Sequence, residues 1–203
     1  MRLHVHKKAF RALGISESFV KGKSVKSVLA GVVMRADKAI DGFTFTEATV
    51  AGMDATEKVI QMIKNLNRKD INVLLLNGCV VSWYNVIDLF KVSKETNLPL
   101  ICVTYEESEG LEKYFKELFP EDCKYRIKIY RKNKKRVQLK LKTGHSVFVR
   151  FLGMNFEQAK ETLDKFTSHG SVPEPLRVAR LLARAIIKTS VFKNAQKHEP
   201  GRN

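Results

Sequence analysis

The side chains with the most evident chemistry are the cations between residues 124 and 142. This stretch holds ten Lys or Arg residues and neither Asp nor Glu. Basic and apolar residues alternate, which predicts two strands of a basic β-hairpin that meet near Asn133, because successive strand side chains point to opposite faces. The predicted outer face and turn contain Lys124, Arg126, Lys128, Arg131, Lys132, Lys134, Lys135, Arg136, Lys140 and Lys142.

A basic ribbon of this kind can follow a phosphate backbone, with Tyr125 or Tyr130 offering a stacking surface for a base. The alternative is a solvated, charged face that keeps an exposed sheet from aggregating. Sparse charge is enough for that purpose, whereas ten like charges repel one another. The pattern therefore favours a nucleic acid as the partner.

A second basic stripe lies in the last apolar stretch of the chain. Arg177, Arg180, Arg184 and Lys188 are three, four and four residues apart, so on a helix they share one face. This face either binds phosphates together with the ribbon or is an ordinary surface in which cations lie near a helix C-terminus. The spacing alone leaves both possibilities open.

The whole chain is strongly basic. Its 203 residues include 37 Lys and Arg against 21 Asp and Glu, a formal net charge of +16. Such an excess attracts polyanions, of which phosphate backbones are the most common. A generally cationic surface, as in a thermophilic or ribosome-associated protein, is the alternative.

Several other classes of chemistry find no support in the sequence. Cys79, Cys102 and Cys123 lie far apart with no Cys-x-x-Cys pair, so we expect reduced thiols and a cytoplasmic protein. We find no apolar run long enough to span a membrane, no signal-peptide pattern, and neither a Gly-x-Ser-x-Gly elbow nor a phosphate-binding Gly-x-x-x-x-Gly-Lys loop.

Alternating and 3.6-residue periodicities predict the elements that must position these side chains. We expect an antiparallel meander first, then strands and helices in alternation, and so an α/β protein whose mixed sheet is covered by helices. Asp54 and Glu57 are spaced as a capping box at the start of the first helix. A single domain is expected over residues 1–193, with a flexible tail over 194–203. The expected strands are 10–15, 27–34, 42–50, 71–76, 100–103 and 145–152, and the expected helices are 54–66, 85–96, 110–119, 156–168 and 173–191.

Six short motifs occur in an order that resembles the archaeal endonuclease dU family. That family is similar to endonuclease V and has a ribonuclease-H-like fold, so the resemblance, from about residue 9 to 190, implies that fold here. The motifs are Arg11-Ala12-Leu13-Gly14-Ile15, Gly52-Met53-Asp54-Ala55-Thr56-Glu57, Leu76-Asn77-Gly78, Tyr84-Asn85-Val86-Ile87-Asp88, Leu98-Pro99 and Pro173-Glu174-Pro175-Leu176-Arg177-Val178-Ala179.

The resemblance also implies a site for Mg²⁺ or Mn²⁺ that would cleave a phosphodiester, because these ions prefer several charged oxygen ligands. Glu17 and Glu57 match acids of this site and are the candidate metal ligands, and with Asn77 they are the candidate catalytic residues. The family's Gly-Ile-Asp-Asp reads Gly-Ile-Ser16-Glu17 here, Asn77 stands where endonuclease V has an Asp, and Arg180 replaces the family's His. These changes predict a degenerate metal site.

Three hypotheses follow from the sequence. The first is a nucleic-acid-binding protein on a ribonuclease-H-like scaffold, with nuclease activity reduced or lost. The second is a Mg²⁺- or Mn²⁺-dependent endonuclease acting on deaminated or modified DNA. The third is a structural or assembly module that binds an acidic protein or a ribosomal partner.

Overall fold

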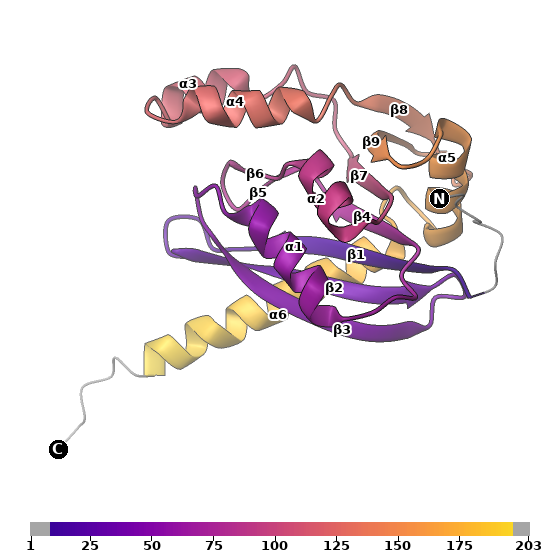
Figure 1. Ribbon diagram of the computed structural model, residues 1–203. Coiled ribbons are helices and arrows are strands. Elements are labelled where there is room, and N and C mark those ends of the chain that lie inside the picture. The colour runs from indigo at the N-terminus through magenta and orange to yellow at the C-terminus, as the bar shows by residue number, and fades with distance from the viewer. Residues whose placement is uncertain (1–8, 197–203) are drawn as a thin grey trace.

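A seven-stranded mixed sheet forms the centre of the protein. The computed structural model describes residues 9–196, with side chains as far as Thr189. The strand order is β3-β2-β1-β4-β7-β9-β8 (Figure 1). The β1–β4 and β4–β7 pairs are parallel and the other pairs antiparallel, which confirms the predicted meander followed by parallel strands. The strands are β1 Arg11–Ser18, β2 Lys26–Arg35, β3 Ile40–Thr49, β4 Val73–Asn77, β7 Leu100–Thr104, β8 Val137–Lys140 and β9 Ser146–Leu152.

Helices cover both faces of this sheet and bury two separate apolar cores. On one face, Val59 and Ile63 of α1 and Val92 of α2 pack with strand residues such as Leu74. On the other face, α5 and the start of α6 pack over β4, β7, β8 and β9. The helices are α1 Ala55–Leu66, α2 Leu89–Thr96, α3 Glu112–Leu118, α4 Cys123–Lys132, α5 Phe156–Phe166 and α6 Glu174–Gln196.

Two element boundaries differ more than the others from the sequence predictions. The helix predicted to begin at Asn85 begins at Leu89, because Asn85–Val86 forms strand β6, which pairs with β5 (Val80–Val81). The last helix runs on to Gln196, and residues 197–203 of the predicted tail lie outside the described residues. Among residues 9–196, none of the helices is long and apolar enough to cross a membrane.

The predicted basic β-hairpin over residues 124–142 is wrong in its first half, because residues 123–132 form helix α4. Basic and apolar residues alternate here, but apolar residues also recur at helical spacing. Ile127, Tyr130 and Cys123 contact the cluster around Phe115 of α3. The hairpin that does form joins β8 to β9. The cations therefore do not line one face of a two-stranded ribbon.

Arg126 explains why α4 is anchored where it is. It was predicted to contact a partner, yet it is 3% exposed and forms an ion pair with Asp122, with Nε and Oδ1 2.7 Å apart. Its guanidinium also donates to the carbonyl oxygens of Ala51, Gly52 and Tyr84. A buried charge is tolerated only when it is paired and hydrogen-bonded in this way. Arg126 is a structural residue of the α4 interface, and the prediction that it lies on an exposed outer face is wrong.

The Arg126 contacts also hold a strained turn in place. Ser82, Trp83 and Tyr84, between β5 and β6, have φ angles of 49°, 59° and 67°, all in the left-handed region. Each costs a non-glycine residue on the order of 1 kcal/mol. Arg126 binds the Tyr84 carbonyl, and the Ser82 carbonyl accepts from Ala51 N at 2.7 Å. Tertiary contacts thus impose a backbone conformation that local propensity disfavours.

The predicted capping box at the start of α1 does not form. The Asp54 carboxylate accepts hydrogen bonds from Thr49 N and Oγ1 and from Asn85 Nδ2, and makes no cap bond to its own helix. Asn85 Oδ1 instead accepts from Ala55 N at 3.0 Å. Asp54 thereby ties the end of β3 to β6, and Glu57 is left free to interact elsewhere.

We expect Arg126→Ala to lower the free energy of unfolding by about 3 kcal/mol, because it leaves three carbonyl oxygens and Asp122 without their shared donor. Lys124→Ala, a neighbouring exposed cation of α4, should change it by less than about 0.5 kcal/mol. Urea denaturation of both variants checks this. Equal stabilities would contradict the anchoring role of Arg126.

Candidate functional site at the carboxyl ends of the parallel strands

Ser16 and Asn77 lie on adjacent strands, Ser16 near the end of β1 and Asn77 at the end of β4. Ile15 pairs with Leu76 in the parallel register, and Ser16 and Asn77 are each one residue further along. Side chains alternate along a strand, so both are on the face covered by α6. Ser16 Oγ donates to the carbonyl oxygen of Leu176 in α6 at 2.8 Å, which fixes the start of this helix over the strand ends.

Arg180 follows Leu176 by one helical turn and brings a positive charge to the same edge. The burial of Tyr105, just beyond β7, raises the pKa of its hydroxyl well above the ordinary value, and the Arg180 guanidinium acts in the opposite direction. The Tyr105 hydroxyl is buried and has no hydrogen-bond partner among the residues described. Ser16, Asn77 and Tyr105 lie near or just beyond the ends of β1, β4 and β7, and Arg180 lies one helical turn beyond Leu176, which accepts from Ser16. We call these four residues the strand-end cluster.

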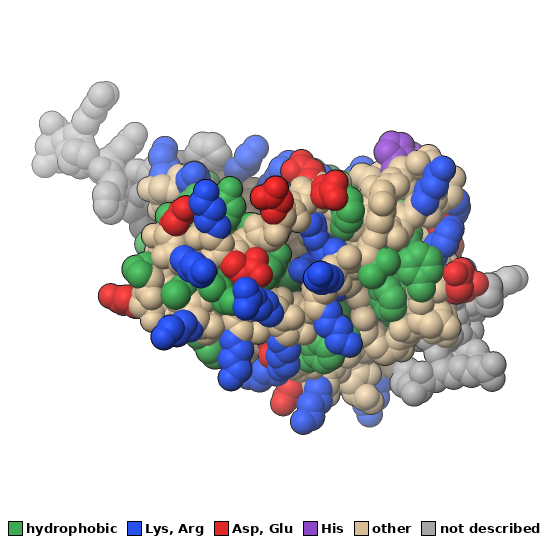
Figure 2. Space-filling model, turned by 90° about the horizontal axis from the view of Figure 1, so that it is seen from above, with side chains coloured by type: hydrophobic (Ala, Val, Ile, Leu, Met, Phe, Trp, Pro, Cys, Tyr) green, Lys and Arg blue, Asp and Glu red, His purple; other side chains and the backbone are tan. Residues whose placement is uncertain are grey.

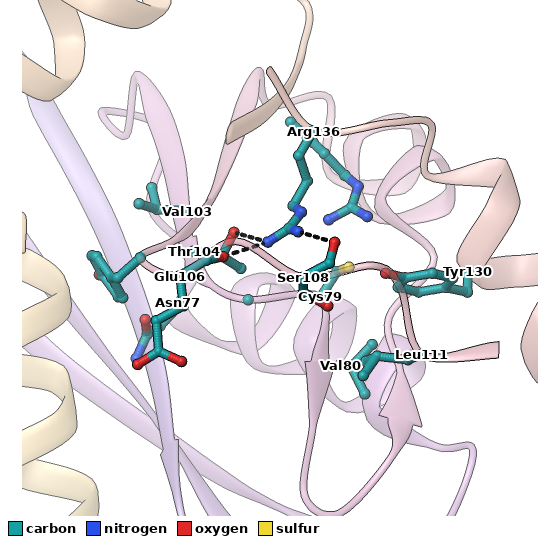
Figure 3. Close-up of a pocket in the computed structure, with 13 residues that line it drawn as sticks. Asn77, Cys79, Val80, Val103, Thr104, Glu106, Ser108, Leu111, Tyr130 and Arg136 are labelled. Atoms are coloured by element: carbon teal, nitrogen blue, oxygen red, sulfur yellow. Dashed lines mark hydrogen bonds between the residues drawn. The ribbon is translucent and has the colours of Figure 1, made fainter. Parts of the chain in front are cut away.

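A pocket of about 360 Å³ opens beside this cluster (Figure 3). Asn77 and Cys79 line it from the end of β4, Tyr105 and Glu106 from the end of β7, and Tyr130 from α4. Arg136 and Arg150 bring two guanidinium groups to the wall. A second hollow, of about 560 Å³, shares Ser108, Tyr130, Arg136 and Arg150 with the first and extends to Arg131, Lys134 and Lys135. The two hollows give a continuous depression from Asn77 to the basic segment.

Glu17 lies on the other face of the sheet from Asn77. Alternation along β1 directs it toward the core of α1 and α2, near Ser82. Burial raises the pKa of the Glu17 carboxyl, and a hydrogen bond from the backbone N–H of Ser82 partly offsets this effect. Its Oε2 atom is buried with no hydrogen-bond partner in the described part of the chain. Glu17 is thus a poorly solvated acid, remote from the Ser16–Asn77 face.

Glu57 is on the exposed side of α1 and forms an ion pair with Lys91 of α2. The three predicted catalytic residues are therefore not gathered: Glu17 and Asn77 face opposite sides of the sheet, and Glu57 pairs between two helices. In residues 9–196 no three His, Cys, Asp or Glu side chains lie close enough together to hold a metal ion. A further acid, Asp88, caps α2 and binds Lys132 Nζ at 2.6 Å.

These residues do not fit Mg²⁺ or Mn²⁺. The strand-end cluster offers a hydroxyl that is already donating, one neutral amide and a guanidinium, whereas the ions require several charged oxygens. A fixed cation at the same place repels a divalent ion. Glu106 is the single carboxylate that lines the adjoining pocket.

The predicted nucleic-acid contacts divide into paired and unpaired cations. Besides Arg126, four form ion pairs or specific contacts within the protein. Arg131 pairs with Glu112, Lys132 with Asp88 and Arg177 with Glu174, while Arg136 donates to Thr104, Glu106 and Ser108. The Lys134 ammonium lies 5.5 Å from the Phe90 ring centre. Among the predicted contacts, the remaining exposed cations, which form no ion pair with the described residues, are Lys124, Lys128, Lys135, Lys140, Lys142 and Arg184.

The two basic segments do not form one surface. Helix α6 packs against β1 and β2 on one side of the sheet, and α4 lies with α3 on the other (Figure 1). On the face seen from above, Lys and Arg side chains are spread widely, with Asp and Glu side chains among them (Figure 2). The prediction of one basic ribbon with a neighbouring basic helix is therefore wrong. The strand ends, with Arg180 and the pocket, connect the side of the sheet that α6 covers with the side on which α4 lies.

Sequence reasoning missed Arg150 and Tyr105. Arg150 is 7% exposed within β9, between Val149 and Phe151. A single arginine inside an apolar strand was the available signal, because a buried cation needs a specific reason. Tyr105 carried no such signal, since its unpartnered hydroxyl depends on tertiary packing.

We expect Glu17→Gln to remove a pH dependence of stability. Because folding raises the pKa of Glu17, the parent loses stability as pH rises from the unfolded pKa of about 4.3 through the folded pKa. The variant should be more stable than the parent at pH 7, with the difference vanishing near pH 4. Urea denaturation across this range measures it, with the exposed Glu121→Gln as control. If the stabilities of parent and variant changed with pH in parallel, the burial of an ionised Glu17 would be contradicted.

Comparison with known proteins gives a consistent result. The sequence profile described as "Endonuclease dU" matches residues 8–187. A UPF0215 protein of Pyrobaculum calidifontis is 35% identical over 175 residues, covering 86% of this chain and 95% of its own. A protein of unknown function from Archaeoglobus fulgidus has a similar crystal structure, with TM-score 0.76, 27% identity, and coverage of 88% of this chain and 98% of that one.

Endonuclease V shares the fold at lower identity. The Ciona intestinalis enzyme, crystallised with a 24mer DNA containing an inosine followed by a ribo-adenosine, superposes with TM-score 0.59 and 15% identity, covering 90% of this chain and 87% of that chain. This likeness confirms the ribonuclease-H-like architecture expected from the sequence. The chain belongs to the endonuclease dU family, whose fold is that of endonuclease V.

Proposed function

We propose that this protein binds nucleic acid at the carboxyl ends of its parallel strands without a metal ion. The observation that carries the proposal is the position of Arg180 one helical turn beyond Leu176, the α6 residue whose carbonyl oxygen accepts from Ser16. In a metal-dependent nuclease, carboxylates at such a place bind cations that in turn contact phosphate. Here a guanidinium can bind a phosphate oxygen directly.

The surroundings of Arg180 support a phosphate-bearing ligand. The depression that begins at Asn77 continues past Arg136 and Arg150 to Lys134 and Lys135. The Ciona endonuclease V of the same fold was crystallised with DNA. With a net charge of +16, the chain also attracts polyanions at long range. We propose that the strand contacts this edge through its backbone, and that the nuclease site is degenerate.

Binding should depend steeply on salt and not on Mg²⁺. Affinity for single-stranded oligonucleotides should fall more than about tenfold between roughly 50 and 200 mM salt, because condensed counterions are released on binding, and EDTA should have no effect. Fluorescence anisotropy with DNA and RNA measures this. No binding to single strands, duplexes or RNA at about 50 mM salt would rule the proposal out.

Arg180→Gln should weaken binding by about tenfold at constant salt, since it removes a charge-assisted contact. The matched control is Lys69→Gln, which removes the same charge from an exposed position before β4, at the opposite edge of the sheet. That variant should bind within about twofold of the parent. Equal losses from both variants would indicate binding by net charge alone, and would remove the strand-end edge from the proposal.

The parent should neither bind Mn²⁺ in calorimetry nor nick uracil- or hypoxanthine-containing strands when Mn²⁺ is supplied. The variant Ser16→Asp/Asn77→Asp/Arg180→His should gain Mn²⁺ binding, because it replaces a hydroxyl, an amide and a cation with metal-binding groups.

Nicking by the parent that is lost in Glu57→Ala would instead establish the endonuclease alternative. Co-purification with an acidic protein and no nucleic acid would favour an assembly module.

A further inference from the structure

Arg136 and Arg150 are placed opposite each other on neighbouring strands. Val137 pairs with Val149 in the β8–β9 register, and Arg136 and Arg150 are each one residue outward from that pair. Like charges directly opposite on adjacent strands are destabilising. Both guanidinium groups line the same two hollows, so the repulsion is concentrated at one place.

Arg150 is a buried cation that lacks an acidic partner. Its Nε donates to the Lys134 carbonyl oxygen at 2.8 Å, and its guanidinium carbon lies 5.4 Å from the Tyr130 ring centre. No ion pair to a carboxylate is found for Arg150 within residues 9–196. The Arg150 charge also acts at the pocket wall, which Cys79 lines. The pKa of the Cys79 thiol is lowered mainly by a hydrogen bond with Cys102, and the Arg150 charge lowers it further. Such a charge is costly unless an anion compensates it.

Arg136 is oriented by neutral groups alone. Its Nη1 donates to Thr104 Oγ1 and the Glu106 carbonyl oxygen, and its Nη2 donates to the Ser108 carbonyl oxygen, at 2.9–3.2 Å. The guanidinium carbon lies 5.1 Å from the centre of the Phe148 ring. These contacts fix the side chain at the pocket without neutralising it (Figure 3). Two oriented guanidinium groups thus share one void.

The acids near this void leave the two charges uncompensated. Glu106 lines the smaller hollow but is exposed, and Glu107 and Glu109 line the outer one, also exposed. Glu112 is engaged by Arg131. A ligand that brings a compact double negative charge and accepts several hydrogen bonds would compensate both guanidinium groups.

We infer that this pocket binds a phosphomonoester, carried either by a terminal phosphate of a nucleic-acid strand or by a free nucleoside monophosphate. Two guanidinium groups match its two charges, and Arg side chains bind phosphate through paired donors. A phosphodiester carries one charge and continues as chain on both sides, so it fits an open groove better than a pocket of this size. The inference goes beyond the proposed function, since a free nucleotide can occupy the pocket without any binding of the backbone.

The test compares single strands of one sequence, internally labelled, that carry a 5′-phosphate, a 3′-phosphate or only hydroxyl ends. One phosphorylated end should bind about tenfold more tightly than the hydroxyl strand at constant salt. Calorimetry with AMP, adenosine and inorganic phosphate provides the second arm, in which AMP should bind and adenosine should not.

Arg136→Gln should abolish the preference for the phosphorylated end, and Arg150→Lys, which keeps the charge but not the paired donors, should reduce it. Lys140→Gln is the matched control from the exposed side of β8, and should weaken all strands equally while retaining the preference. Thermal unfolding verifies that each variant is folded. A preference that survives Arg136→Gln in a folded protein assigns the phosphate to another site and overturns the inference.

The two arms separate this inference from the proposed function. Strands that bind without preference for a phosphorylated end, together with no binding of AMP, would overturn the inference and leave the proposed function standing. Binding of AMP but of no strand would support the pocket and overturn the proposed function. A preference for a phosphorylated end without AMP binding supports the strand end as the source of the phosphate.

Discussion

The close contact between α6 and β1 determines the geometry of the strand-end site. A Cβ atom at Gly14 would lie 2.5 Å from Pro175 Cβ and 2.6 Å from Pro175 C, so only glycine lets the helix approach this closely. Two residues further along β1, Ser16 closes its hydrogen bond to Leu176. The helix is thereby held in one position over the strand ends. Arg180, one helical turn beyond Leu176, is positioned by this contact.

Given this scaffold, the chemical character of the edge depends on a few side chains. A cluster of carboxylates would recruit a metal ion, and the occupancy of such a site varies with metal supply and pH. An arginine supplies a permanent charge that neither a chelator nor an ordinary pH change can remove. Under the proposed function, Ser16, Asn77 and Arg180 make this place suited to anions instead of cations, while the β1–α6 framework stays the same. Activation of water, which needs the metal, is then lost as well.

The sequence predicted the central architecture well, because the features that define it are local. Apolar runs such as Leu74–Leu76 indicate strands buried on both faces, and the motif at Pro173–Ala179 marks the start of α6. The basic segment was misread because alternation with period two and helical spacing coexist over ten residues. What decided between them was the burial of Arg126, whose acceptors at Ala51, Gly52 and Tyr84 are at least 42 residues away in the chain. Contacts of that range leave no mark on local periodicity.

The same limit applies to the candidate site. The sequence gives the number of charged residues but does not show which of them are paired with an opposite charge in the fold. Arg131, Lys132 and Arg177 are as basic as Lys124 in the sequence, yet each meets a carboxylate in the fold. Conversely, Arg150 is a single residue of β9. Because it is buried and has no acidic partner in the described chain, its charge influences a ligand more than the charge of any exposed lysine does. A surface charge is screened within about 10 Å by salt, whereas a charge at the wall of a pocket acts on whatever enters. For a protein this basic, the position of the uncompensated buried cations is therefore more informative about the ligand than the net charge.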